Sequence, residues 1–165
     1  MVNSVEDLAA LLQRQKAARI AEGPVNAAVR RDRLQRAIDM LVRHRDALCD
    51  ALDADFGNRP RVVSLTMDVM GAITSLKYAQ KHVARWMKPR HCKGVMPFSL
   101  FGARGWVEYQ PKGVVGILGT WNFPLYTMLA PLAYVLAAGN RSLIKPSELN
   151  PRTAETLARA VEECF

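Results

Sequence analysis

Residues 114–119 read Val-Val-Gly-Ile-Leu-Gly, a continuously apolar run that is rich in β-branched side chains. Such a run is typical of a strand that is buried on both faces of a parallel sheet. A second strand is predicted at Arg141–Lys145, after an apolar stretch from about Pro124 to Ala138 that ends at Gly139-Asn140. Because glycine and asparagine commonly end helices, the stretch between the two strands is predicted to be a helix.

The pattern continues beyond the second strand. Pro146–Pro151 is predicted to be a loop and Arg152 to about Glu163 a helix. A β-α-β-α order with short connections predicts an α/β fold with a parallel sheet and a right-handed crossover. The sequence ends at Phe165, without the third strand that such a unit normally feeds. We therefore expect a truncated unit, from a gene fragment, a partial record or one piece of a split enzyme.

Upstream of the strands, apolar residues recur at helical spacing. We expect three helices: one that begins at Ser4 and ends at Gly23-Pro24, one over about Val25–Asp55 closed by Phe56-Gly57, and one over about Val62–Met87 stopped by Pro89. Ser4 is a suitable N-cap for the first helix. Residues 91–103 are expected to form a Gly- and Pro-containing connector, and the alternation in Trp106–Gln110 predicts a half-exposed strand.

The formal net charge is +8, and the basic residues gather upstream. Residues 1–110 hold 18 Lys and Arg against 11 Asp and Glu, whereas the remainder holds 5 against 4. A basic face can bind nucleic acid or an acidic membrane. Here the charges fall between apolar positions of helical period, so we interpret them as solvated helix faces and expect no nucleic acid and no membrane as partner. No apolar run reaches the roughly 18 residues of a transmembrane helix.

The N-terminus lacks the apolar core and cleavage site of a secretory signal. Arg14, Lys16 and Arg19 leave a mitochondrial transit peptide open, although Glu6 and Asp7 argue against it. The expected location is cytoplasmic.

Three cysteines, Cys49, Cys92 and Cys164, match neither a zinc spacing nor a disulfide framework, so no metal site is predicted. Cys92 stands beside Arg90, His91 and Lys93, which favour a thiolate. We interpret it as incidental, because reactive sites need a specific supporting context.

The loop Gly119–Pro124 follows the first strand, at the end where open α/β sheets bind ligands. It has no G-x-G-x-x-G phosphate motif. Asn122 stands just before the predicted helix, where asparagine is a good N-cap. Its amide is also suited to donate to a developing oxyanion, as in acyl-transfer sites. The residues alone leave both roles open.

Lys145 and Glu148 stand at the carboxyl end of the second strand. The lysine either extends out of the sheet toward solvent or donates to a ligand hydroxyl or phosphate. The glutamate can accept hydrogen bonds from ribose hydroxyls. The alternative is a turn with a capping carboxylate.

Several motifs in their order and spacing resemble the aldehyde dehydrogenase superfamily: RRDRL (30–34), DALCDALDADFGNR (46–59), WMKPR (86–90), VEYQPKGVVGI (107–117), PKGVVGILGTWNFPLY (111–126) and LAAGNRSLIKPSELNPRT (136–153). The resemblance covers nearly all of 25–165 and is greatest to the coniferyl aldehyde dehydrogenase branch. It implies an N-terminal helical region (1–103), an arm strand (104–113) and the first βαβα part of an NAD-binding, Rossmann-like domain (114–165).

The resemblance also implies roles for single residues. Asn122 matches the catalytic side-chain half of the oxyanion hole. The expected cofactor-binding residues are Thr120, Trp121, Asn122, Lys145, Ser147 and Glu148, of which Thr120 and Trp121 are expected to line the cofactor cleft largely through their backbone. Lys145 and Glu148 match the pair that holds the adenosine ribose. A glutamate there repels a 2′-phosphate, so the expected cofactor is NAD, with NADP possible. Trp106–Gln110 matches an arm used in homo-oligomer association.

In the family, a cysteine thiolate attacks the aldehyde substrate, hydride passes to nicotinamide, and a glutamate activates water to hydrolyse the thioester. The nucleophile and the base belong to regions outside this sequence, and none of the three cysteines replaces the nucleophile. By itself, the chain is therefore expected to be inactive. The alternative is a non-catalytic interaction module that keeps the helices and the arm.

Overall fold

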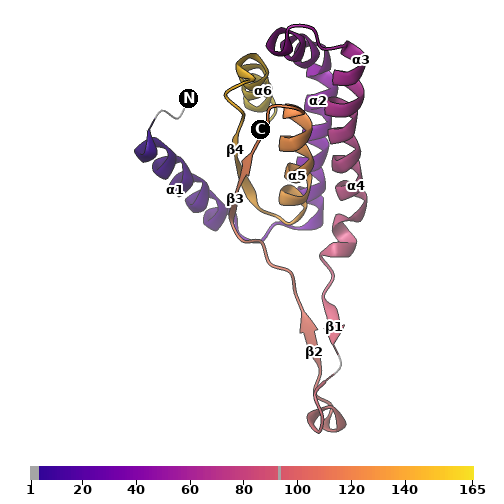
Figure 1. Cartoon of the computed structure of the whole chain (residues 1–165). Helices are drawn as coiled ribbons and strands as arrows, with labels where there is room; N and C mark the ends of the chain where they lie inside the picture. Colours follow the sequence, from indigo (N-terminus) through magenta and orange to yellow (C-terminus); the bar gives the residue numbers. More distant parts are fainter. Residues whose placement is uncertain (1–3, 93) are drawn as a thin grey trace.

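The computed structural model describes residues 4–92 and 94–165 (Figure 1). Residues 1–3 and Lys93, a basic neighbour of Cys92, lie outside the described residues. The helices are α1 (Val5–Glu22), α2 (Ala27–Phe56), α3 (Arg61–Val63), the π-helical η1 (Ser64–Met70), α4 (Gly71–Trp86), the 3-10 turn η2 (Phe98–Phe101), α5 (Pro124–Ala137) and α6 (Pro151–Cys164). The strands are β1 (Arg90–Cys92), β2 (Gly105–Val107), β3 (Val114–Leu118) and β4 (Arg141–Lys145).

The strands β3 and β4 pair in parallel, with Val114 opposite Arg141 and Leu118 opposite Lys145. The helix α5 connects them and packs against both, while α1 lies on the other side of the sheet (Figure 1). The predicted βαβα unit of an α/β fold is therefore confirmed.

One expectation for β3 is wrong. The strand ends at Leu118, one residue before Gly119, and it is not buried on both faces. Ile117 is its one buried residue, whereas Leu118 is 77% exposed. Within the described residues the sheet has only β3 and β4, so the face away from α5 is covered by α1 alone.

The helices α2, α4, α5 and α6 form a layer with one shared core. It contains completely buried leucines from three of them: Leu34, Leu41, Leu48, Leu52, Leu76, Leu125 and Leu129. Burying a leucine side chain contributes roughly 1.5–3 kcal/mol relative to exposure, so this cluster is a main source of stability. The core joins the helical region to the βαβα unit, and the three-part division at 103 and 113 remains a prediction.

The predicted caps of the first two helices are largely confirmed. The backbone N–H of Asp7 donates to Ser4 Oγ at 3.0 Å, and Gly57 ends α2 with a φ of 79° in the left-handed region. The helix α2 begins at Ala27 rather than Val25, because the side chain of Asn26 accepts from Val29 N and caps it.

The third predicted helix, Val62–Met87, is a continuous helical stretch from Arg61 to Trp86, but its segment Ser64–Met70 is π-helical. π-helical turns inside α-helices are frequent at functional sites. This one carries Asp68, whose side chain is fully buried.

The region before β3 differs from the expectation. The connector 91–103 includes part of a strand, β1, which pairs antiparallel with β2, with His91 opposite Trp106. The predicted strand Trp106–Gln110 is shorter and lies at Gly105–Val107. This hairpin extends away from the rest of the molecule (Figure 1). Its far end exposes apolar side chains: Val95, Met96, Phe98, Leu100 and Phe101.

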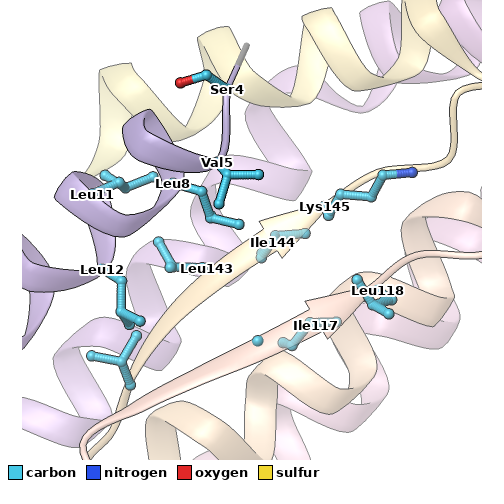
Figure 2. A pocket seen from close by; sticks show the side chains of 12 residues that line it. Ser4, Val5, Leu8, Leu11, Leu12, Ile117, Leu118, Leu143, Ile144 and Lys145 are labelled. Atoms are coloured by element: carbon cyan, nitrogen blue, oxygen red, sulfur yellow. The ribbon is translucent and has the colours of Figure 1, made fainter. Parts of the chain in front are cut away.

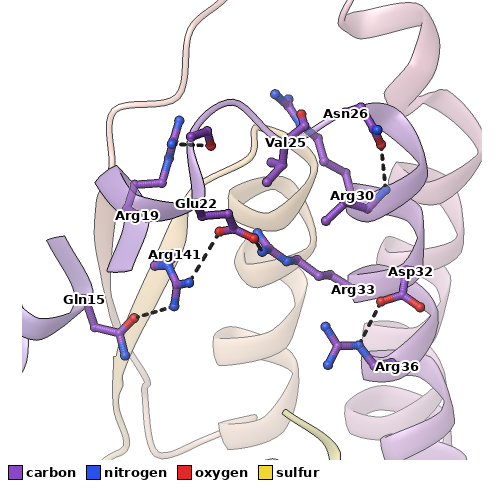
Figure 3. Close-up of polar contacts among 12 residues, drawn as sticks. Gln15, Arg19, Glu22, Val25, Asn26, Arg30, Asp32, Arg33, Arg36 and Arg141 are labelled. Carbon is purple, nitrogen blue, oxygen red and sulfur yellow. Dashed lines mark hydrogen bonds and ion pairs between the residues drawn. The ribbon is translucent and has the colours of Figure 1, made fainter. Parts of the chain in front are cut away.

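The helix α1 is joined to the sheet by polar contacts (Figure 3). Arg141 on β4 donates to Gln15 Oε1 at 3.2 Å and pairs with Glu22 at 3.4 Å. Glu22 also pairs with Arg33 on α2, so one carboxylate links three elements. In the described part of the chain, no helix is long and apolar enough to cross a membrane.

Candidate functional site

Two loops leave the sheet next to each other at its carboxyl edge. The backbone N–H of Gly119, just after β3, donates to the carbonyl oxygen of Lys145, the last residue of β4, at 2.9 Å. The expected site residues of both loops therefore follow from one edge of the sheet, where open α/β sheets bind ligands.

The first loop shows that Asn122 is not an N-cap. The N-cap position of α5 is Phe123, and the side chain of this residue makes no capping hydrogen bond. The Oδ1 atom of Asn122 instead accepts a hydrogen bond from the hydroxyl of Thr120 at 2.8 Å. Thr120, Trp121 and Asn122 are all exposed at this edge. The N-cap interpretation is therefore wrong, and the side chain of Asn122 is available for another role.

A carboxylate from another helix caps α5. Asp68 Oδ1 accepts from the backbone N–H groups of Leu125 at 3.1 Å and Tyr126 at 3.2 Å. Burial raises the pKa of Asp68, and the hydrogen bond from Tyr126 and the charge of Arg59 offset part of that rise. The sequence interpretation missed this residue. Its one signal was an acid on the same helical face as Ala72 and Leu76, where apolar residues are expected.

Arg59 connects Asp68 to the first loop. Its Nη2 pairs with Asp68 Oδ2 at 2.6 Å, and its Nη1 donates to the backbone carbonyl of Asn122 at 2.9 Å. The guanidinium carbon lies 4.4 Å from the ring centroid of Phe56 and 5.1 Å from that of Phe123. The Arg59 side chain is only 8% exposed, so it is held by charge, hydrogen bonds and two aromatic rings together.

The second loop holds an exposed ion pair. Lys145 Nζ lies 2.7 Å from Glu148 Oε2, and the two side chains are 64% and 78% exposed. The hydrogen bond from Lys145 lowers the pKa of Glu148 below its ordinary value. Ser147 between them is buried, and its Oγ accepts from the N–H of Leu149. Ser147 therefore shapes the turn, while the charged pair faces outward.

Helix α6 is capped by Asp55 on α2 and not by Glu148. Its two carboxylate oxygens accept from Arg152 N at 3.1 Å and Thr153 N at 2.8 Å. The cap of α6 therefore comes from a helix that is about a hundred residues away in the sequence, 97 and 98 positions from the two N–H groups.

A groove of about 850 Å³ lies between α1 and the open face of the sheet (Figure 2). It is lined by aliphatic side chains apart from Ser4 and Lys145, and Ser4 is already used as the cap of α1. The groove therefore offers few groups that could orient a polar ligand. In the described ranges, no cluster of three or more His, Cys, Asp or Glu is arranged to hold a metal ion.

The comparisons with known proteins agree with one another. The model of the aldehyde dehydrogenase family matches residues 3–165. A coniferyl aldehyde dehydrogenase of Pseudomonas sp. (strain HR199 / DSM 7063) is 48% identical over 160 residues, which are 97% of this chain and 32% of that protein. This chain thus spans about a third of the length of that relative.

Solved structures show the same relationship. The substrate-bound state of Staphylococcus aureus AldH matches with a TM-score of 0.88 at 26% identity, over 99% of this chain and 34% of that one. An NAD-dependent benzaldehyde dehydrogenase from Corynebacterium glutamicum matches with a TM-score of 0.81 at 28% identity, over 98% of this chain and 34% of that one. By sequence and by fold, the chain belongs to the aldehyde dehydrogenase family.

Proposed function

We propose that this chain supplies the oxyanion-binding amide and the ribose-binding part of the cofactor cleft of an NAD(P)-dependent aldehyde dehydrogenase. The substrate we propose is an aromatic aldehyde of the coniferyl type, oxidised to the carboxylic acid. The observation that carries the proposal is the geometry of Asn122, whose side-chain oxygen is engaged by Thr120. This leaves the amide N–H groups as the donating end of the side chain.

The chemical role of Asn122 follows from that geometry. When a nucleophile adds to an aldehyde, the carbonyl oxygen becomes an oxyanion, and a fixed amide donor stabilises it more than it stabilises the neutral aldehyde. Asn122 is exposed at the carboxyl edge of the sheet, so an incoming aldehyde can reach it. The nucleophile and the water-activating base are expected from outside these residues, so we propose that this chain alone does not turn over aldehyde.

The residues of the second loop fit a dinucleotide. The ammonium of Lys145 can donate to one ribose hydroxyl, and the carboxylate of Glu148 can accept from the hydroxyls. Both groups are exposed and lie 2.7 Å from each other, so one ribose can reach both of them. The nicotinamide, when bound, accepts the hydride. The negative charge of Glu148 disfavours a 2′-phosphate, which supports NAD over NADP. The NAD dependence of the Corynebacterium relative agrees with this proposal.

A chimera tests the enzymatic proposal. In it, this chain replaces the matching third of the Pseudomonas coniferyl aldehyde dehydrogenase, to which it is 48% identical. We expect the chimera to reduce NAD with coniferyl aldehyde, followed at the absorbance of NADH. Asn122→Ala should lower kcat about 100- to 1000-fold, as removal of one oxyanion donor does elsewhere. The matched control Asn58→Ala, at an exposed site, should leave kcat unchanged. A folded chimera in which Asn122→Ala keeps full kcat would overturn the proposal.

A second candidate function rests on the hairpin β1–β2. Its far end exposes Met96, Phe98 and Phe101, which are 65%, 64% and 87% exposed. Contiguous exposed apolar side chains often mark protein–protein contacts. We propose that the arm associates with another copy of the family enzyme. A non-catalytic module would bind an intact homologue in size-exclusion chromatography without binding NAD, whereas the enzymatic proposal expects NAD binding by the chimera. An NAD titration therefore separates the two.

A further inference from the structure

Asn122 is held at both of its hydrogen-bond acceptors. Its backbone carbonyl accepts from Arg59 Nη1 at 2.9 Å, and its side-chain Oδ1 accepts from Thr120 Oγ1 at 2.8 Å. Its side-chain NH₂ makes no hydrogen bond to any residue that the structure describes. The contacts therefore fix the residue while leaving its donating end open.

The hydroxyl of Thr120 has two acceptors within reach, Asn122 Oδ1 at 2.8 Å and Thr127 Oγ1 at 3.2 Å. Thr127 Oγ1 accepts from Thr120 N at 3.2 Å and lies 3.4 Å from the carbonyl of Pro124, to which it can donate its one hydrogen. The hydroxyl of Thr120 then donates to Asn122, its shorter contact. Because the hydroxyl donates, it selects the amide orientation in which Oδ1 faces Thr120 and the NH₂ faces away.

The hydrogen bond from Arg59 to the backbone carbonyl of Asn122 is fixed in place, because the Arg59 side chain is itself held by other contacts. Its ion pair with Asp68 joins side chains that are 8% and 0% exposed, and the ring of Phe123 next to Asn122 lies against the guanidinium. Asp68 in turn accepts from Leu125 N and Tyr126 N at the start of α5. The Arg59–Asp68 ion pair thus contacts both the loop, at the carbonyl of Asn122, and the first N–H groups of the helix α5 that follows it.

We propose that Arg59, Asp68 and Thr120 are positioning residues that aim the Asn122 amide at the reacting carbonyl oxygen. This proposal rests on the proposed function, since it assigns a purpose to the fixed orientation of that amide. A donor that is already fixed needs no reorganisation when charge develops, whereas a mobile donor loses much of its effect. The side chains of Arg59 and Asp68 are only 8% and 0% exposed, so the role assigned to them acts through Asn122 and not through contact with aldehyde or cofactor.

The matched pair Thr120→Val and Thr120→Ser tests the side-chain contact in the chimera. Valine keeps the shape and removes the hydroxyl, whereas serine keeps the hydroxyl. We expect Thr120→Val to lower kcat about tenfold with the KM for NAD unchanged, and Thr120→Ser to retain the parent kcat. In the Asn122→Ala background, Thr120→Val should have no further effect, because residues that act as one unit are non-additive. A tenfold loss in that background as well would overturn the proposal.

Arg59→Lys tests the backbone contact. Lysine keeps the charge beside Asp68, so the ion pair can persist, but it lacks the planar fork that reaches two acceptors at once. We expect kcat to fall about tenfold with unchanged KM for NAD. The control is Arg61→Lys, because among the described residues Arg61 forms ion pairs with the exposed Asp46 and Asp50 alone. An unchanged kcat in Arg59→Lys would contradict the proposal.

A measurement that does not depend on enzyme activity distinguishes the oxyanion role of Asn122 from the positioning role of its neighbours. In ¹⁵N NMR spectra of this chain, the Asn122 side-chain NH₂ should be rigid, and Thr120→Val should make it mobile on the ps–ns timescale. Unchanged mobility overturns the positioning role while the oxyanion role of Asn122 stands. If Asn122→Ala has no effect on the kcat of the chimera, the oxyanion role fails and the positioning role fails with it.

Discussion

The carboxylate of Asp68 accepts a hydrogen bond from the backbone N–H of Leu125, although the two residues are 57 positions apart in the sequence. The first N–H groups of a helix have no partner inside the helix and need an external acceptor. Asp55 provides the same contact to α6 through Arg152 and Thr153. Both helices of the βαβα unit therefore begin at a proline and are capped by a carboxylate from the helical region.

These caps predict a loss of stability on substitution. Asp55→Ala should lower the free energy of unfolding by about 1–2 kcal/mol, the usual range for a lost cap. Asp68→Ala should cost about 3–5 kcal/mol, because it also leaves Arg59 buried without its partner. Urea unfolding of this chain, followed by circular dichroism, measures both. The control is Asp39→Ala on the exposed face of α2, expected within about 0.5 kcal/mol of the parent. Equal effects at all three positions would contradict the capping argument.

The ion pair between Lys145 and Glu148 predicts a pH dependence. Its hydrogen bond lowers the folded-state pKa of Glu148 below the ordinary 4.5. A depressed carboxyl pKa means that the stabilising contact is present above the ordinary value and is lost as the pH falls through the folded-state value. The effect on stability should be small, because both groups are exposed.

An NMR titration of the Glu148 side chain in this chain measures that pKa directly. The parent should titrate below 4.5, and Lys145→Ala should raise the pKa toward that value. Lys112→Ala, a change at an exposed lysine upstream of β3, is the control and should leave the Glu148 titration unchanged. A Glu148 titration that Lys145→Ala does not shift would show that the ion pair is not the cause.

Glu148 also predicts the choice of cofactor. In the chimera, kcat/KM should be higher with NAD than with NADP, because the carboxylate repels the 2′-phosphate. Glu148→Gln keeps a hydrogen-bond acceptor and removes the charge, so it should lower the NAD-to-NADP ratio about tenfold, equivalent to about 1.4 kcal/mol. Glu155→Gln, at an exposed site on α6, should leave the ratio unchanged. If Glu148→Gln leaves the NAD-to-NADP ratio of kcat/KM unchanged, charge repulsion by Glu148 is not the cause of the cofactor preference.

Gly139 is predicted to be intolerant of a side chain. Its φ is +81°, and a Cβ there would lie 2.7 Å from Cζ of Arg30, a buried side chain that donates to the carbonyl of Ala137 at the end of α5. Gly139→Ala should therefore cost about 2 kcal/mol or more, from left-handed backbone strain and displacement of Arg30. Gly116→Ala is the matched control, since a Cβ there meets no atom within 4 Å. Urea unfolding compares them, and equal midpoints would refute the prediction.

The three cysteines should react at different rates with a thiol reagent. Cys92 is exposed, Cys164 is partly buried and Cys49 is buried. Burial also raises the pKa of the Cys49 thiol, which lowers its thiolate fraction. We expect Cys92 to be labelled first and Cys49 only after unfolding in urea. Cys92→Ser should remove the fast phase alone; a fast phase that survives this change would assign it to another thiol.

Much of the secondary structure was predictable because its signals are local. Helical spacing located α2 and α4, Ser4 and Gly57 marked helix ends, and the apolar run before Gly119 located β3. The hairpin was predicted only in part, since β1 exists through pairing with β2 rather than through a pattern of its own. The expected burial of β3 was wrong, because burial depends on which elements cover the sheet.

The sequence by itself determined the order of the long helices and of β3 and β4, because periodicity and turn chemistry are properties of neighbouring residues. The order and spacing of its motifs indicated the family and the two loops that carry Asn122, Lys145 and Glu148. The tertiary structure alone decided that Asp68, and not Asn122, caps α5, and that Arg59 holds the carbonyl of Asn122. The physical reason is that a polar group's partner depends on where the folded chain brings other donors and acceptors. Contacts across 57 and 63 residues leave no periodic pattern in the sequence.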